Sequence, residues 1–461
     1  MLSVAWCRIM WPMSRLCLRF AVALCFASAA TFSIPHAGAA PARGRYYVVA
    51  PHDGGFMAAQ QKRGEKDDWD AMIRAAEARK RSHPKDINAW FSAAYAHFKW
   101  GEVDAAERNY RQCLDMDPKR HVEFNVSLRN IADFRKRWPG LRLQRPVWVE
   151  SDVDRERAVW RAKAAGLLKA KKYDQIEQAA YGMQASRRAG RDGVWDLEKF
   201  ASGLWTVDEG PNAPAVWKDS QARIAAWRKA RPKSMLAQIA AMASWFEGAY
   251  LARGTDTADK VSEQQFRTMN ERLEGASKLM PALRLGRGKS PLVAHRFLQW
   301  AVLSGMERAE FLQIAADANA AFPTYTGFDF VTVRYLMERW HGEAGEWETY
   351  AARRADAVGG VQGDIWYARL IASQRDSFEN IWKGSTADWH RAQRGCETLL
   401  KQYPDSLDWG TEYYRLAYLH YETAVSQRLM VKVLRNRAKK GAWKSLGRFS
   451  NARMNVLTLT K

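Results

Sequence analysis

The stretch RWHGEAGEWETYA, residues 339 to 351, gathers side chains that are suited to chemistry. His341 and Glu343 could hold one metal ion, or act as base and acid, if the loop folded back on itself. Glu346 and Glu348 are two residues apart, so on a helix they point to different sides. Glutamates in a first helical turn also complement the positive end of the helix. We therefore interpret the stretch as a turn between two helices, which leaves His341 and Glu343 as weak catalytic candidates.

Other motifs that would indicate catalysis or a cofactor are incomplete. Residues 286 to 290 read GRGKS, but a phosphate-binding loop needs a glycine where Leu283 stands, and Pro291 follows the serine. Ser82 and Lys85 lie in an expected exposed turn, where nothing activates the lysine. No histidine pair has the HExxH spacing, and no cysteine pair has the spacing of a zinc finger. We assign no catalytic residue, no cofactor and no metal site, and the sequence leans against an enzyme without excluding one.

The charge of the chain favours anionic partners. It carries 72 Lys and Arg against 50 Asp and Glu, a formal net charge of +22. Such a positive field attracts anionic lipid head groups, acidic glycans or acidic proteins. No nucleic-acid-binding motif stands out, and the expected export of the chain argues against a nucleic-acid partner.

The N-terminus has the pattern of a bacterial signal peptide. Arginines precede the apolar run FAVALCFASAATFSI, and Ala37-Gly38-Ala39 has the small residues of a cleavage site. We predict a signal peptide at residues 1–39, with Met13 as an alternative initiator, followed by a flexible segment at residues 40–60. The mature protein is then periplasmic or secreted, with no transmembrane span. Its two cysteines, Cys113 and Cys396, are expected to be separate buried thiols, although an oxidising compartment would permit a bridge.

Helical periodicity dominates the remaining sequence, and one segment has the spacing of a known repeat. Pro84 and Pro118 enclose INAWFSAAYAHFKWGEVDAAERNYRQCLDMDP, which resembles a tetratricopeptide repeat. The match departs at His97, where the pattern expects an aromatic residue. The resemblance implies an all-α superhelix of antiparallel helix pairs, with a tetratricopeptide-like module at residues 61–140. It also implies a concave binding groove lined by the first helix of the repeat: Asn88, Phe91, Tyr95 and Lys99.

Two further stretches follow the layout of the second repeat helix, and both begin with an acid before tryptophan. They start at Asp68-Trp69 and Asp388-Trp389, and Glu346-Trp347 shares the pattern. We expect a helix to start at each of these three pairs.

A second resemblance covers roughly residues 155 to 425. The segments around Asp192-Gly193-x-Trp195, Arg339-Trp340-x-Gly342 and Tyr367-Ala368-Arg369-Leu370 are similar to an uncharacterised bacterial family, domain of unknown function 4034. That resemblance implies helical architecture and supplies no catalytic residues. We therefore expect a larger helical-repeat body at residues 150–430 and a basic C-terminal tail at residues 431–461.

These features favour an exported helical-repeat protein that binds or scaffolds a peptide, protein or anionic partner. A glycan-active hydrolase or lyase on a helical scaffold is the first alternative, because helical folds can host carboxylate and histidine chemistry. A structural component of the envelope or of a secretion system is the second.

The enzyme alternative has a direct test at His341. We expect His341→Ala to leave the protein folded and its metal content unchanged, because a turn histidine holds no ion. Metal analysis of the purified protein and the variant measures this. Stoichiometric zinc or calcium that is lost in the variant would favour the enzyme instead.

Overall fold

The computed structural model describes residues 54–207, 212–254, 260–284, 286, 288–304 and 306–459. Within these residues the protein is all-α apart from one two-stranded sheet and one isolated bridge, and successive helices pack on each other. The predicted fold class, an all-α superhelix of helix pairs, is confirmed. The predicted signal peptide, residues 1–39, lies outside the described residues, as does the first part of segment 40–60. Residues 54–60 belong to the first described helix.

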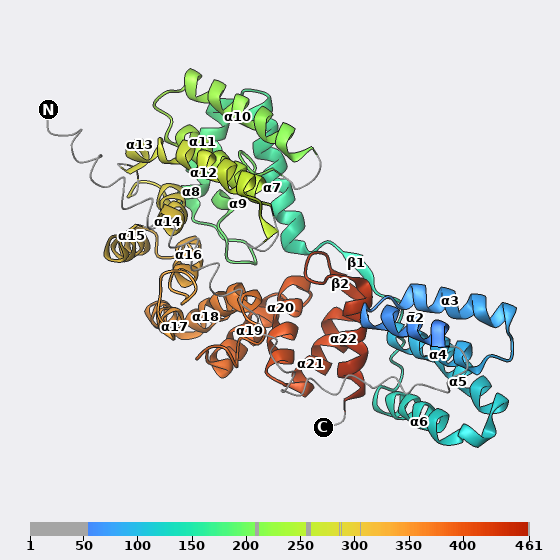
Figure 1. Ribbon diagram of the computed structural model, residues 1–461. Helices are drawn as coiled ribbons and strands as arrows, with labels where there is room; N and C mark the ends of the chain where they lie inside the picture. Colours follow the sequence, from blue (N-terminus) through green and yellow to red (C-terminus); the bar gives the residue numbers. More distant parts are fainter. Residues whose placement is uncertain are drawn as a thin grey trace. The chain divides into compact units, whose positions relative to one another are not determined.

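The described residues form two compact units. Unit 1 consists of Val153–Glu379 and Lys383–Ala387. Unit 2 combines residues 54–152 with Asn380–Trp382 and residues 388–459, so it contains both ends of the described chain. Figure 1 labels the helices and strands of both units.

Unit 1 is built from consecutive helices of the middle part of the sequence. They are α7 (Asp152–Lys169), α8 (Tyr173–Ser186), α9 (Asp196–Ser202), α10 (Ala213–Ala230), α11 (Met235–Arg253), α12 (Glu263–Ser277), α13 (Met280–Arg284), α14 (Pro291–Ser304), α15 (Arg308–Ala321), α16 (Gly327–Tyr335), α17 (Glu346–Val358), α18 (Gly360–Gln374) and the 3₁₀ turn η3 (Arg375–Ser377).

Unit 2 has helices from both ends of the sequence and a short parallel sheet that joins them. Its first part holds α2 (Gly54–Glu65), α3 (Trp69–Ser82), α4 (Ile87–Trp100), α5 (Val103–Met116), η1 (Pro118–Arg120), α6 (His121–Arg137) and β1 (Val147–Val149). Its second part holds α19 (Trp389–Gln402), α20 (Leu407–Leu419), α21 (Thr423–Leu429), the π-helical turn η4 (Met430–Leu434), β2 (Arg437–Lys439) and α22 (Leu446–Thr458). In the sheet, Trp148 pairs with Ala438.

The predicted repeat forms the helix pair α4 and α5, for local reasons. The Asp86 side chain caps α4 by accepting from the Asn88 amide. Gly101 ends α4 with φ +84°, a left-handed conformation that glycine adopts at little cost. Pro118 follows the end of α5, where its ring cannot continue the helix.

The pattern of an acid before tryptophan marks three helix starts in two different ways. Asp68 and Asp388 are N-caps whose carboxylates accept backbone N–H groups, and the tryptophan after each is the first helical residue. Glu346 is itself the first residue of α17, after Gly345 with φ +78°. Each tryptophan is buried against its neighbours.

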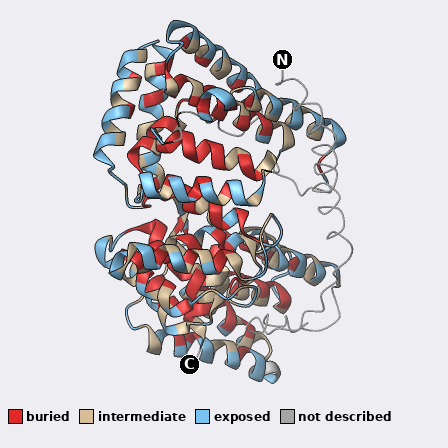
Figure 2. Ribbon diagram, turned by 90° about the vertical axis from the view of Figure 1, so that its left-hand side faces the viewer, coloured by how far each residue is buried: buried red, intermediate tan, exposed pale blue. Residues whose placement is uncertain are grey.

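Buried residues lie on the helix faces that meet neighbouring helices, as Figure 2 shows. Small residues make this contact close. Ala89, Ala93, Ala94 and Ala96 of α4 are all fully buried. Burial of these faces supplies the main stabilisation of helices that are short.

Helix α22 packs against α4 and α6 in unit 2, although it lies at the opposite end of the sequence. Two indoles, at the start of α3 and just after the end of α6, also donate to its backbone. The Trp69 indole donates to the Gly447 carbonyl (3.0 Å), and the Trp138 indole donates to the Leu457 carbonyl (2.9 Å). The segment expected as a basic tail therefore contains an ordered helix that belongs to unit 2.

Arg453 anchors α22 without a carboxylate partner. Its side chain is fully buried, and its guanidinium donates to the backbone carbonyls of Trp100 (3.1 Å), Gln144 (3.1 Å) and Arg435 (3.3 Å) and to the Asn436 side chain (2.5 Å). Burial lowers the pKa of Arg453 to about 10. The guanidinium thus ties together four segments of unit 2 that are distant in sequence.

We expect Arg453→Ala to lower the free energy of unfolding of unit 2 by about 3 kcal/mol, because buried carbonyls lose their donor and a cavity remains. Urea denaturation with hydrogen exchange of α4 and α22 measures this. Arg448→Ala is the matched control: its side chain on α22 is 59% exposed and lies 4.0 Å from Asp67. It should cost less than about 0.5 kcal/mol. Equal losses would show that Arg453 does not anchor α22.

Candidate functional site

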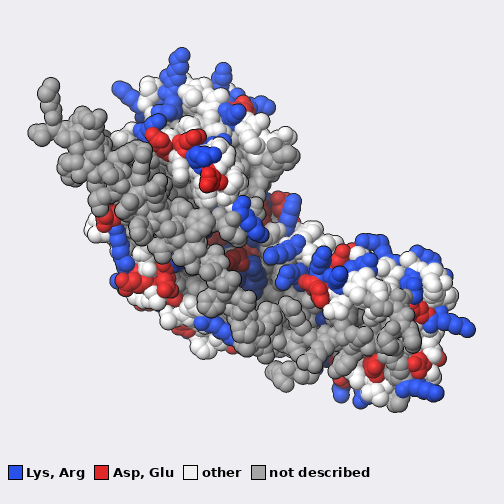
Figure 3. Space-filling view, viewed as in Figure 1, with Lys and Arg blue, Asp and Glu red and all other residues white. Residues whose placement is uncertain are grey.

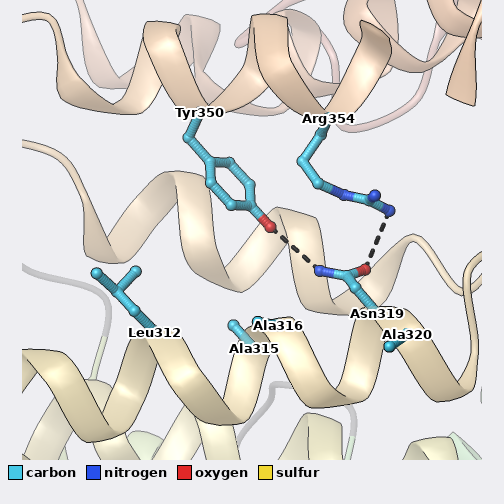
Figure 4. Close-up of a pocket in the computed structure, with 7 residues that line it drawn as sticks. All are labelled: Leu312, Ala315, Ala316, Asn319, Ala320, Tyr350 and Arg354. Atoms are coloured by element: carbon cyan, nitrogen blue, oxygen red, sulfur yellow. Dashed lines mark hydrogen bonds between the residues drawn. The ribbon is translucent and has the colours of Figure 1, made fainter. Parts of the chain in front are cut away.

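A surface pocket of about 360 Å³ lies between α15 and α17 in unit 1. Helix α15 supplies one wall with Leu312, Ala315, Ala316, Asn319 and Ala320, and α17 supplies the other with Tyr350 and Arg354. Figure 4 shows these side chains converging from the two helices. The volume and the mixture of an apolar wall with a few polar groups are typical of a small binding site.

The sequence of α15 explains the apolar wall. Its residues RAEFLQIAADANAA place Phe311, Ile314 and Ala315 in the core. Ala316 and Ala320 come next on the helix surface, and both are exposed. Because alanine side chains are short, the pocket can form beside them without removing atoms from the core.

Asp329 organises the polar wall. It lies on α16, and its side chain has no exposed surface. Its carboxylate accepts from the Tyr350 hydroxyl (2.5 Å), the Arg354 Nε (2.9 Å), the Trp366 indole (2.8 Å) and the Asn319 amide (3.2 Å). A buried carboxylate with four donors is fully satisfied, so Asp329 positions its neighbours and has no lone pair left for a ligand.

The protonation states of the polar wall follow from this buried carboxylate. Burial and the nearby Asp329 charge raise the pKa of Tyr350 well above its usual range, so its hydroxyl keeps its proton and donates. Burial acts to lower the pKa of Arg354, but the attraction of Asp329 outweighs it and the net shift is upward. The wall is therefore a fixed cation next to a neutral phenol.

Arg354 is the group that remains able to bind a ligand. Its Nε donates to Asp329, and its Nη2 donates to the Asn319 carbonyl oxygen (3.1 Å). Its Nη1 is not used in the bonds to Asp329 and Asn319, and the side chain is 17% exposed. The pocket can thus accept an apolar group against the alanines and offer a guanidinium N–H to a carbonyl or carboxylate oxygen.

A second buried polar cluster in unit 1 does not line the pocket. Glu198 of α9 accepts from Arg296 and from the Tyr325 hydroxyl, and its Oε2 lies 3.3 Å from His295 Nδ1. Burial opposes ionisation of Glu198, but Arg296 and His295 outweigh it and hold its pKa well below the usual range. Burial lowers the pKa of His295. The cluster joins α9 to α14, which makes it a structural link.

His341 and Glu343 make separate contacts in the structure. His341 Nε2 lies 2.8 Å from the Val302 carbonyl, and its ring stacks on Tyr335 at 4.5 Å. Glu343 is exposed, and its amide donates to Glu346, which is ion-paired with Arg308. Glu348 is buried and accepts from the Thr386 amide. The described residues contain no group of three or more His, Cys, Asp or Glu side chains placed to hold a metal ion.

The four predicted groove residues of unit 2 contact other parts of the same unit. Asn88 is buried, and Phe91 packs on Tyr110 and Phe124. Tyr95 packs on Trp69.

Lys99, the fourth predicted groove residue, meets α22 and donates to the Asn455 side chain (2.7 Å). Burial lowers the pKa of Lys99 to about 8. Lys99 is therefore held by α22 within unit 2, and its role in ligand binding stays a prediction.

The structure also describes the two cysteines and the hydropathy of the helices. Cys113 and Cys396 are both buried and unbridged. No helix in the described ranges combines the length and hydropathy that a bilayer span requires.

Sequence reasoning missed the pocket between α15 and α17, although two signals were present. Asp329 interrupts the apolar run GFDFVTVRY, where a lone carboxylate must find buried donors. Tyr350 and Arg354 are four residues apart, so they share a face of α17. Both signals indicate a buried polar cluster, but the helix that faces it cannot be read from them.

Comparison with solved structures finds a low similarity to the following two. The crystal structure of yeast Tom70 aligns with 7% identity and a TM-score of 0.30, over 88% of this chain and 80% of that one. The structure of Naa15/Naa10 bound to HypK-THB aligns with 12% identity and a TM-score of 0.17, over 82% of this chain and 63% of that one. No protein-family model matches the chain, and no curated protein does. The resemblance to domain of unknown function 4034 is thus not confirmed, and the assignment of helix pairs rests on the chain itself.

The Glu198 cluster predicts a pH dependence of stability. The folded protein binds a proton at Glu198 less readily than the unfolded chain, whose carboxyl has the ordinary pKa of 4.5. The stability from this group is complete above that value and falls as the pH drops below it. We expect the free energy of unfolding of the wild type to fall more steeply than that of Glu198→Gln between about pH 5 and about pH 3.

Urea unfolding across that range measures the difference. The control is Glu263→Gln, a glutamate whose side chain is 94% exposed on α12. If Glu198→Gln and Glu263→Gln follow the same curve as the wild type, Glu198 does not carry the acid sensitivity.

Proposed function

We propose that this protein is a helical-repeat binding or scaffolding protein, and that its pocket between α15 and α17 holds a peptide segment of a protein partner. The pocket itself is the observation that carries the proposal. It offers an apolar wall of Leu312 and alanines next to the guanidinium of Arg354. Pairs of helices in a repeat protein present such surfaces side by side.

The chemistry of the pocket defines the segment that it would bind. An apolar side chain would pack against Leu312, Ala316 and Ala320. The carbonyl or carboxylate oxygen beside that side chain would accept from Arg354. Because Asp329 already fixes Arg354 through two hydrogen bonds, little side-chain entropy is lost when the ligand binds.

Two parts of the proposal rest on the sequence alone. The signal-peptide pattern at residues 1–39 supports export to the periplasm or beyond. The net charge of +22 supports an anionic partner or envelope surface.

The alternative of a hydrolase or lyase has no support at the pocket. No carboxylate is among the residues that line it, and Asp329, which holds Tyr350 and Arg354, is buried and accepts from four donors. The alternative of a structural envelope component is compatible with peptide binding and differs from it only in the permanence of the complex.

The test fills the pocket without touching the core. Ala316 is exposed, so Ala316→Trp places an indole in the pocket at little cost in stability. A peptide library displayed on phage is selected on the wild type, and the affinity of an enriched synthetic peptide is then measured by fluorescence anisotropy. We expect enriched peptides with an apolar residue beside an acidic residue or a C-terminal carboxylate, and Ala316→Trp to weaken binding at least about tenfold.

The matched control is Gln313→Trp on the same helix. Gln313 is exposed and does not line the pocket. It should change the affinity less than about twofold. Selection of no peptide, or equal loss in both variants, would refute peptide binding at this pocket.

A further inference from the structure

The last segment of unit 2 carries positive charge without acidic neighbours in sequence. From Thr423 to Lys461 the chain contains ten Lys and Arg residues and no Asp or Glu. The structure sorts these cations into two groups. Arg428 pairs with Glu397, Lys439 pairs with Asp408 at 2.5 Å, and Arg453 is buried among carbonyls. Those three charges are used within the fold.

Four other cations of the segment face outward. Lys432, Arg435, Lys440 and Lys444 are all exposed. No carboxylate among the described residues pairs with any of them, and the one side-chain bond of Arg435 goes to the Val431 carbonyl (3.3 Å). Exposed cations that have no partner in the fold remain free to neutralise an external anion.

Exposed apolar side chains lie next to these cations. Val147 and Trp148 of β1 are 55% and 42% exposed, which is unusual for a valine and a tryptophan. Backbone bonds fix where they lie. The Val147 amide donates to the Asn436 carbonyl (2.9 Å), beside Arg435, and the Lys440 amide donates to the Val149 carbonyl (3.1 Å). The two side chains point to opposite faces of the strand, and Arg435 and Lys440 lie in the chain next to its two ends.

We call this surface the β1–β2 basic surface: Trp148, Lys432, Arg435, Lys440 and Lys444. In Figure 3, Lys and Arg side chains gather around the position of the two strands. Glu150, directly after β1, is the nearest acid in sequence and is exposed. Asp152 follows two residues later, and Asp408 is paired with Lys439, so the four exposed cations still outnumber the acids beside them.

We propose that the β1–β2 basic surface docks on an anionic phospholipid bilayer. Each free cation lies where it can meet a lipid phosphate, and Trp148 has the amphipathic ring that favours the head-group region. Cations alone would suit any acidic polymer equally well. The exposed indole of Trp148 beside them favours a lipid surface, because an interface that combines charge with a shallow apolar phase accommodates both kinds of group.

Vesicle co-sedimentation of the full chain tests the proposal, with phosphatidylcholine vesicles compared with vesicles that contain about 30% phosphatidylglycerol. We expect binding to the anionic vesicles only, weaker at about 0.5 M salt than at about 0.1 M. Lys440→Glu/Lys444→Glu should weaken binding at least tenfold, and Trp148→Ser at least threefold.

The control makes the same change of charge elsewhere. Lys171→Glu/Lys172→Glu reverses two exposed lysines in the turn between α7 and α8 of unit 1, where no exposed large apolar residue lies beside them in sequence. It should leave vesicle binding within twofold of the wild type. Circular dichroism confirms that each variant is folded.

Two results would overturn the proposal. In the first, the wild type does not bind anionic vesicles, or both double variants lose binding equally, so that net charge alone acts. In the second, soluble polyglutamate binds as tightly as the vesicles and Trp148→Ser has no effect. That outcome would assign the β1–β2 basic surface to an acidic polymer or protein instead.

Discussion

The pairing of short helices is the constraint on which the rest of this structure depends. The longest described helix, α11, has 19 residues, and most have about 14. Helices of that length are marginal in water, so each must bury a face against a neighbour to persist. The alanine face of α4 and the tryptophans at helix starts serve this need. A pocket or charged surface can then occupy only the faces that pairing leaves free.

The parts of the fold that depend on local sequence were predictable. Proline spacing, Gly101 and the Asp86 cap located α4 and α5, because caps and turns act within a few residues. The role of α22 was not predictable in this way. Its contact with α4 joins residues about 350 positions apart, as the bond from Ser450 to Lys99 illustrates. A run of cations at the end of a chain looks like a solvated tail until its partners are known.

The same difference between local and distant contacts applies to the candidate site. His341 and its glutamates attracted attention because they are adjacent in sequence, yet His341 contacts the Val302 carbonyl and a tyrosine ring. The pocket residues come from α15 and α17, and Asp329 of α16 brings the polar ones together. Sequence spacing showed that Tyr350 and Arg354 share a face, but it could not show that α15 lies opposite.

Unit 2 is made from the two ends of the described chain, and this has a consequence for biosynthesis. The ribosome makes α4 about 350 residues before it makes α22, an interval on the order of tens of seconds. Throughout that time the face of α4 around Lys99 and Trp100 lacks the helix that covers it in the finished protein. The nascent chain therefore displays an incomplete core of unit 2 until α22 has been made.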